Sequence, residues 1–200
     1  MKCILSFLLL TVFFILSGCT QLPEKPSEAD QISLWLEHQI AVGQIYSWDI
    51  SGRVGIKTDR DSGSATLHWH QFGSDFEMRI IAPLGQGTYI FRGSPAGVVM
   101  LGPDNVVITA DNPEQLMLDA LGWSVNLAGM QYWIRGIPEP DTTYSKLSLD
   151  GYGRLGYLDQ AGFSIEIQRY AELEKFSLPE KLTIKSDDLQ LKMVIKSWEL

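Results

Sequence analysis

The chain has 200 residues, of which 45% are hydrophobic, and its 24 acidic and 16 basic residues give a formal net charge of −8. This acidic balance argues against a nucleic-acid-binding protein, whose phosphate contacts need Lys and Arg. It also excludes a polybasic patch for electrostatic attachment to anionic lipid, while the length suits one medium-sized domain with a real core.

The chain begins like an exported protein. Lys2 precedes an apolar run from Ile4 to Leu16, and a charged start followed by a short apolar segment is typical of a secretory signal peptide. The run is shorter than the about 20 residues of a membrane-spanning helix. Leu16-Ser17-Gly18-Cys19 resembles the bacterial lipobox, in which cleavage leaves an acylated Cys at the new N-terminus. An ordinary signal peptide followed by a chance Cys is the alternative.

Residues 1–18 are therefore predicted to be a lipoprotein signal peptide, with Cys19 as the lipidation site. Their removal takes away Lys2 and no acid, so the charge moves from −8 to −9. Since Cys3 leaves with the signal, the mature chain cannot form an internal disulfide. Residues 19–28 include two prolines and no apolar periodicity, which favours a lipidated tether. A single domain should follow over residues 29–200, held at the membrane by its acyl chains.

The domain is expected to open with a helix. Ser27 is a typical N-cap, and Gly43 would end the helix after about Val42. Four apolar residues recur at helical spacing and should share one face: Ile32, Trp35, Leu36 and Ile40.

Alternation of apolar and polar residues then predicts strands. Segments at about 48–57, 65–70 and 76–80, joined by short polar turns, favour an antiparallel meander. Three more strands are expected at about 87–93, 97–101 and 105–109. One face of the meander is strongly apolar.

The periodicity returns to helical after residue 110. Asn112-Pro113-Glu114 is a helix start, predicting one helix over 113–121 and a second, short one over 127–135. Five strands should close the chain, at about 143–149, 153–159, 162–169, 180–186 and 189–198. The fold class is therefore α+β and mainly β: a curved antiparallel sheet of about eleven strands, with about three helices over its concave hydrophobic face.

The apolar residues of this concave face allow two interpretations. They form either a packed core between sheet and helices, or a partly open cavity suited to acyl chains. The candidate cavity residues are Trp35, Trp48, Ile50, Val54, Leu67, Trp69, Phe76, Met78, Ile80, Leu116, Met117 and Trp133.

The segment Pro83-Leu84-Gly85 is unusual, because a large apolar residue stands in a turn where polar residues are expected. Leu84 either folds back onto the core or forms an exposed apolar tip that contacts a membrane or a partner.

No catalytic constellation is evident. His68 and His70 share one strand face, but a third metal ligand is missing. Gly93-Ser94-Pro95-Ala96-Gly97 places its Ser one position early for a nucleophile elbow. We therefore expect a protein that is not an enzyme and that holds no metal or cofactor.

Several segments together resemble the LolB family of outer-membrane lipoproteins. Besides the lipobox and a Trp-bearing first helix, they are Gly52-Arg53-Val54-Gly55-Ile56, the stretch from Phe76 to Gly85, Tyr132-Trp133-Ile134-Arg135-Gly136-Ile137-Pro138, and the ending from Pro179 to Trp198. The resemblance covers essentially the whole mature chain.

The resemblance implies an open half-barrel with helices over a hydrophobic cavity. The family takes lipoproteins from the periplasmic carrier LolA and inserts them into the inner leaflet of the outer membrane, and its protruding-loop Leu falls on Leu84. Thr20 after the lipidated Cys agrees with outer-membrane sorting. The first strand departs from the family in being partly aliphatic, as at Ile50 and Val54. A monomer that binds no nucleic acid is expected, and the alternative is an anchored binding module for another lipid or amphiphile.

Overall fold

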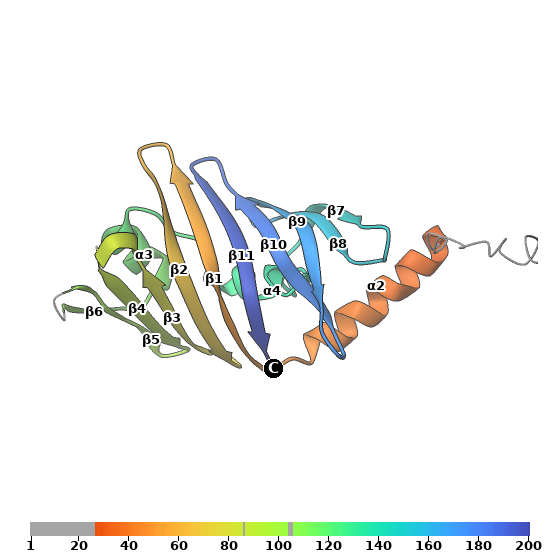
Figure 1. The fold of residues 1–200 in the computed structure, drawn as a ribbon, viewed down its shortest axis with the longest axis horizontal. Coiled ribbons are helices and arrows are strands. Elements are labelled where there is room, and N and C mark those ends of the chain that lie inside the picture. The colour runs from red at the N-terminus through yellow and green to blue at the C-terminus, as the bar shows by residue number, and fades with distance from the viewer. Residues whose placement is uncertain (1–26, 86, 104–105) are drawn as a thin grey trace, which may run out of the picture.

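The structure is a computed structural model that describes residues 27–85, 87–103 and 106–200. The predicted signal peptide, Cys19 and most of the predicted tether lie outside these residues. Within the described part, the chain forms one antiparallel sheet with helices α2, α3 and α4 (Figure 1). The predicted fold class is confirmed.

The sheet has eleven strands within the described residues, in the spatial order β6-β5-β4-β3-β2-β1-β11-β10-β9-β8-β7. Their bounds are β1 Ser47–Thr58, β2 Ser62–Phe72, β3 Asp75–Ile81, β4 Thr88–Ser94, β5 Gly97–Leu101, β6 Val107–Ala110, β7 Tyr144–Leu149, β8 Leu155–Gln160, β9 Phe163–Glu172, β10 Ser177–Lys185 and β11 Leu189–Glu199. Each half of the sheet is a meander of sequential neighbours, and β1 and β11 join the two halves along one seam (Figure 1).

A bulge interrupts this seam. Ser51 pairs with Ser197 and Gly52 with Ile195, so Lys196 is the extra residue on β11. A Cβ at residue 52 would collide with the carbonyl oxygen of Val194, which explains why glycine stands there.

One face of the sheet is buried and the other is exposed, as the alternation predicts. Trp48, near the start of β1, lies on the buried face, with its ring 5.2 Å from that of Trp69 and 5.7 Å from that of Trp198. Helices α3 (Pro113–Leu121) and α4 (Leu127–Trp133) pack on this face (Figure 1). The result is a closed core between sheet and helices.

The four apolar residues predicted to share one face of the first helix do not all face the core. In α2 (Glu28–Gly43), Trp35 and Val42 are buried, whereas Ile32, Leu36 and Ile40 are 52%, 53% and 65% exposed. The reason is that α2 does not lie over the concave face: it runs past the turns between β7 and β8 and between β9 and β10 (Figure 1). It therefore buries a narrow strip, and the other apolar residues point outward.

Candidate functional site

The loop between β3 and β4 presents Leu84 to solvent. Pro83–Gly85 forms a 3-10 turn, and the loop is closed by a hydrogen bond from the Ala82 amide to the Gly87 carbonyl, 3.0 Å long. Leu84 has φ 55° and ψ 26°, a left-handed conformation that is unfavourable for a residue with a Cβ. Its side chain is 98% exposed. Of the two interpretations of this Leu, the structure supports the exposed tip and excludes a Leu folded back onto the core.

A groove of about 790 Å³ lies beside this loop. Pro83 is part of its wall, so the exposed Leu84 stands at the margin of the groove. The β1–β2 turn and the start of β11 form further walls, and the end of α3 closes it on the helix side. The apolar lining consists of Ile56, Ala65, Ile80, Ala82, Pro83, Tyr89, Leu118, Leu121, Trp123 and Leu189.

The polar part of the lining comes mainly from the β1–β2 turn. Asp59, Arg60 and Asp61 lie there, and Asp188 approaches from the β10–β11 turn. Thr58 orders this turn, since its hydroxyl accepts hydrogen bonds from the backbone amides of Arg60 and Asp61, 3.3 and 3.0 Å long. The lining is therefore mixed: apolar side chains come mainly from the sheet and the end of α3, and the charged ones come from two turns.

Most of the predicted cavity residues lie in the core rather than on the groove. Of the twelve, only Ile80 borders it. Eleven are buried, and Phe76 is half-buried with its ring over Gly93. The packed-core interpretation thus describes the conformation seen here, and contact of these residues with acyl chains stays a prediction.

Eight apolar residues of the groove were not among the predicted site residues: Ile56, Ala65, Ala82, Tyr89, Leu118, Leu121, Trp123 and Leu189. Trp123 could have been found, because it stands between Gly122 and Ser124 just after the end of an amphipathic helix, where a large apolar residue without a core position is conspicuous. Nothing in the sequence indicates that β11 contributes to the same groove.

The buried core is rich in methionine. Apart from Met1, every methionine of the sequence is buried there: Met78, Met100, Met117, Met130 and Met193. Unbranched thioether side chains repack easily, so this core can adapt to small shifts of the elements around it.

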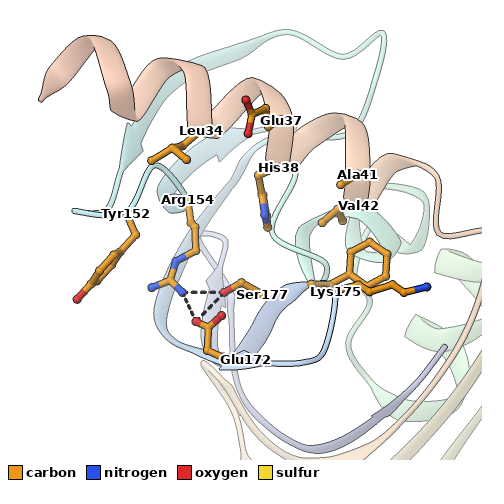
Figure 2. A pocket seen from close by; sticks show the side chains of 11 residues that line it. Leu34, Glu37, His38, Ala41, Val42, Tyr152, Arg154, Glu172, Lys175 and Ser177 are labelled. Carbon is orange, nitrogen blue, oxygen red and sulfur yellow. Dashed lines mark hydrogen bonds and ion pairs between the residues drawn. The ribbon is translucent and has the colours of Figure 1, made fainter. Parts of the chain in front are cut away.

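A second hollow, of about 770 Å³, lies beneath α2 (Figure 2). Leu34 and His38 point into it from the helix, while Arg154 faces them from the β7–β8 turn and Glu172 from the end of β9 (Figure 2). The Nε2 atom of His38 is buried without a hydrogen-bond partner among the described residues. Burial, and after it the charge of Arg154, lower the pKa of His38, so the ring is held neutral.

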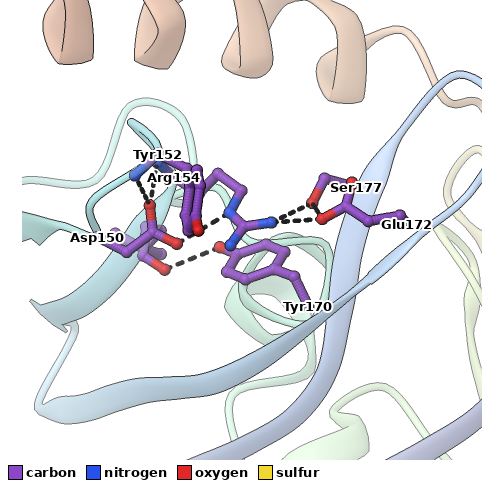
Figure 3. A network of polar contacts seen from close by, with 7 residues as sticks. Asp150, Tyr152, Arg154, Tyr170, Glu172 and Ser177 are labelled. Atoms are coloured by element: carbon purple, nitrogen blue, oxygen red, sulfur yellow. Dashed lines mark hydrogen bonds and ion pairs between the residues drawn. The ribbon is translucent and has the colours of Figure 1, made fainter. Parts of the chain in front are cut away.

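The floor of this hollow is a polar network centred on Arg154 (Figure 3). Its guanidinium donates to Asp150 (2.9 Å), to Glu172 (2.7 Å) and to Ser177 (2.7 Å), and it stacks 4.3 Å from the centroid of the Tyr170 ring. Every charged group in the network has a partner of opposite charge, so this cluster fastens the ends of β8, β9 and β10 together rather than offering a free binding group.

Arg135 fixes the C-terminal end of α2. Its Nη1 donates to the carbonyl of Ile45 at 3.0 Å and to that of Val42 at 3.4 Å, while its Nε donates to Gln131 at 2.8 Å. Burial lowers its pKa. The neighbouring Trp133 is fully buried and donates to Gln160 at 2.8 Å. The Tyr132–Pro138 segment therefore connects α4 to the C-terminal end of α2 and to the sheet through hydrogen bonds.

His68 and His70 lie on the exposed face of the sheet. His70 Nδ1 is 2.9 Å from the carboxylate of Asp49 on the adjacent strand. Among residues 27–85, 87–103 and 106–200, no group of three or more His, Cys, Asp or Glu side chains is arranged to hold a metal ion. In the same part of the chain, no helix combines the length and the apolar character needed to cross a membrane.

Comparison with known proteins decides the family. The family described as "Outer membrane lipoprotein LolB" matches residues 46–198, which is more than half of the chain. The chain belongs to the LolB family. Membership confirms the resemblance seen in the sequence, and it confirms an outer-membrane, lipid-anchored localisation.

Relatives support this LolB assignment over nearly the full length. The outer-membrane lipoprotein LolB of Nitrosococcus oceani is 36% identical over 198 residues, covering 99% of this chain and 98% of the relative. LolB of Pseudomonas aeruginosa strain PAO1 is 36% identical over 195 residues, covering 96% and 95%. Among solved structures, a DUF1329 family protein from Desulfovibrio piger has a TM-score of 0.54 at 9% identity, covering 86% of this chain and 92% of that one. The last likeness concerns the fold alone.

Proposed function

We propose that this LolB-family protein accepts lipoproteins from a LolA-like carrier and inserts them into the inner leaflet of the outer membrane. Acyl chains on Cys19 hold the domain at the membrane, and the protein acts as a monomer. Transfer breaks no covalent bond, so it needs no nucleophile, metal or cofactor. The observation that supports the proposal most directly is the position of Leu84, which is 98% exposed at the margin of a partly apolar groove.

The groove is the entry site for the acyl chains. Its volume of about 790 Å³ falls in the range of roughly 300–1,000 Å³ that is usual for ligand sites. Exposing an acyl chain to water costs about 0.8 kcal/mol per CH₂, so a sixteen-carbon chain costs roughly 12 kcal/mol. An apolar path from carrier to groove avoids that cost at every stage.

The core behind the groove receives the rest of the chain. Ile80 borders both the groove and the core, and Met117 of α3 lies in that core with the other four methionines. A shift of α3 away from β5 and β6, the strands it contacts, would open the methionine-rich interior to the guest. The predicted cavity residues would then line the bound chains.

Leu84 acts at the last step, when the tip enters the leaflet and the guest leaves the groove. The test is a reconstituted transfer assay with a LolA-like carrier, lipoprotein cargo and liposomes. Leu84→Glu should accept cargo but fail to insert it, whereas Tyr144→Glu, at an exposed apolar residue on the far edge strand, should do both. Normal insertion by Leu84→Glu contradicts the role of the tip. Failure of the parent protein to take cargo, with retention of another lipid seen by native mass spectrometry, would support a binding module instead.

A further inference from the structure

The outward side of α2 carries an apolar stripe that the core does not use. Ile32, Leu36 and Ile40 follow one another at intervals of four residues and are 52%, 53% and 65% exposed, so they lie in one line along the helix surface. In Figure 1, α2 lies at the margin of the molecule, and no other labelled element flanks its outer side.

The stripe is free of charge. At 100° per residue, the sector that holds Ile32, Leu36 and Ile40 also contains Ala29 and Gly43, and it is flanked by Ser33 and Gln39. None of these residues ionises. The acidic residues of the helix, Glu28, Asp30 and Glu37, fall outside this sector, and α2 contains no Lys or Arg. Because the stripe carries no charge and the helix around it is acidic, any contact that the stripe makes must come from burial of apolar surface and not from electrostatic attraction.

The position of the stripe in the chain identifies that surface. Eight residues, 20–27, separate Cys19 from the start of α2. Even when fully extended, they keep the helix within about 30 Å of an acylated Cys19, a distance similar to the length of the helix itself. The lipid surface is therefore always close to α2, and such a tether turns weak binding into frequent contact through a high effective concentration.

We propose that the stripe of Ile32, Leu36 and Ile40, with the neighbouring Ala29, lies on the lipid surface of the outer membrane and holds α2 parallel to it. Three half-exposed side chains provide much less area than the about 800 Å² that each partner contributes to a stable protein interface. A lipid surface needs no matching partner patch. This inference rests on the lipid anchor and not on cargo transfer.

The two membrane contacts are separate. α2 and the β3–β4 loop lie toward opposite ends of the long axis of the molecule (Figure 1). The stripe is thus a resting contact next to the anchor, distinct from the tip formed by Leu84.

The test measures how deeply a nitroxide label on the lipidated protein enters the bilayer of proteoliposomes made of phosphatidylcholine and phosphatidylethanolamine. The mature chain has no cysteine besides Cys19, whose thiol is consumed by lipidation, so single labels can be placed by Ala29→Cys, Leu36→Cys and Glu37→Cys. The expected result is a severalfold higher ratio of oxygen to water-soluble nickel-chelate collisions at residues 29 and 36 than at residue 37. Equal ratios at all three residues overturn the proposal.

The second arm separates apolar binding from mere proximity to the anchor. With the label at residue 29, the triple change Ile32→Gln, Leu36→Gln and Ile40→Gln should abolish the raised ratio, while the control Glu37→Gln keeps it. All the substituted side chains are exposed, and circular dichroism checks that the helix is retained. A raised ratio that persists in the triple variant refutes lipid contact through the stripe. A raised ratio that disappears when the protein is diluted in the vesicles also refutes it, and indicates that a second copy of the protein covers the stripe.

Discussion

Leu84 should make the protein less stable than it could be. At φ 55° and ψ 26°, a residue with a Cβ costs roughly 1–2 kcal/mol relative to ordinary backbone conformations, and a side chain that is 98% exposed returns almost nothing through burial. Asn tolerates this conformation better. Leu84→Asn should therefore raise the free energy of unfolding by about 0.5–1 kcal/mol, which for a domain of this size corresponds to about 1–4 °C in Tm.

The assay is urea and thermal unfolding of the mature protein, followed by tryptophan fluorescence, alongside lipoprotein insertion into liposomes. Leu84→Asn should gain stability and lose insertion. Ala161→Asn is the matched control, because Ala161 also has a positive φ, 52°, in the two-residue β8–β9 turn before Gly162, where Asn-Gly is the favoured pair. It should gain similar stability with insertion unchanged.

The reasoning is refuted if Ala161→Asn stabilises the protein while Leu84→Asn leaves it unchanged or weaker. That result would mean that the tip residue is supported by contacts that a 98% exposed side chain does not have. If the prediction holds, the Leu is retained at this turn against a cost in stability, as is common at functional sites.

Two further predictions concern the seam and α2. Gly52→Ala should lower the free energy of unfolding by about 1–3 kcal/mol in urea titration, because the added Cβ meets the Val194 carbonyl. Gly55→Ala is the control: no such atom lies closer than 3.8 Å to its added Cβ, so it should change the free energy of unfolding by less than about 0.5 kcal/mol. Equal effects of the two substitutions would contradict this account. His38 has a pKa below its ordinary 6.5 through burial and Arg154, so the unfolded chain takes up the proton first and stability should fall as pH drops below about 6.5. His38→Phe should show a shallower fall in pH-dependent urea titrations, and an unchanged slope would refute the assignment.

The sequence predicts the elements of this fold well, because one-sided burial imposes a period of two on every strand. Trp48 and Ile50 at one end of the chain and Leu191 and Met193 at the other alternate clearly and are all buried. What the pattern cannot give is the pairing of β1 with β11, since contact between the two ends of the chain leaves no trace in local periodicity.

The site is less predictable for two physical reasons. The apolar residues of α2 obey helical spacing, but spacing does not say which side meets the sheet, and Ile32 and Leu36 face outward. Likewise, the exposure of Leu84 depends on its backbone conformation, which the neighbouring Pro83 and Gly85 permit but do not dictate. The groove takes its walls from distant elements, so its lining emerges only in three dimensions.

The seam has a consequence for how the protein must fold after export. Asp49 on β1 pairs with Glu199 on β11, so the central hydrogen bonds of the sheet cannot form until the last residues of the chain have arrived. Until then, the edge of β1 that should bond β11 has free backbone hydrogen-bonding groups. Pairing of strands so far apart in the sequence is slow, and the unpaired state is prone to aggregation. We expect this late step to limit the folding rate, and truncation of β11 to cause aggregation rather than a smaller, soluble domain.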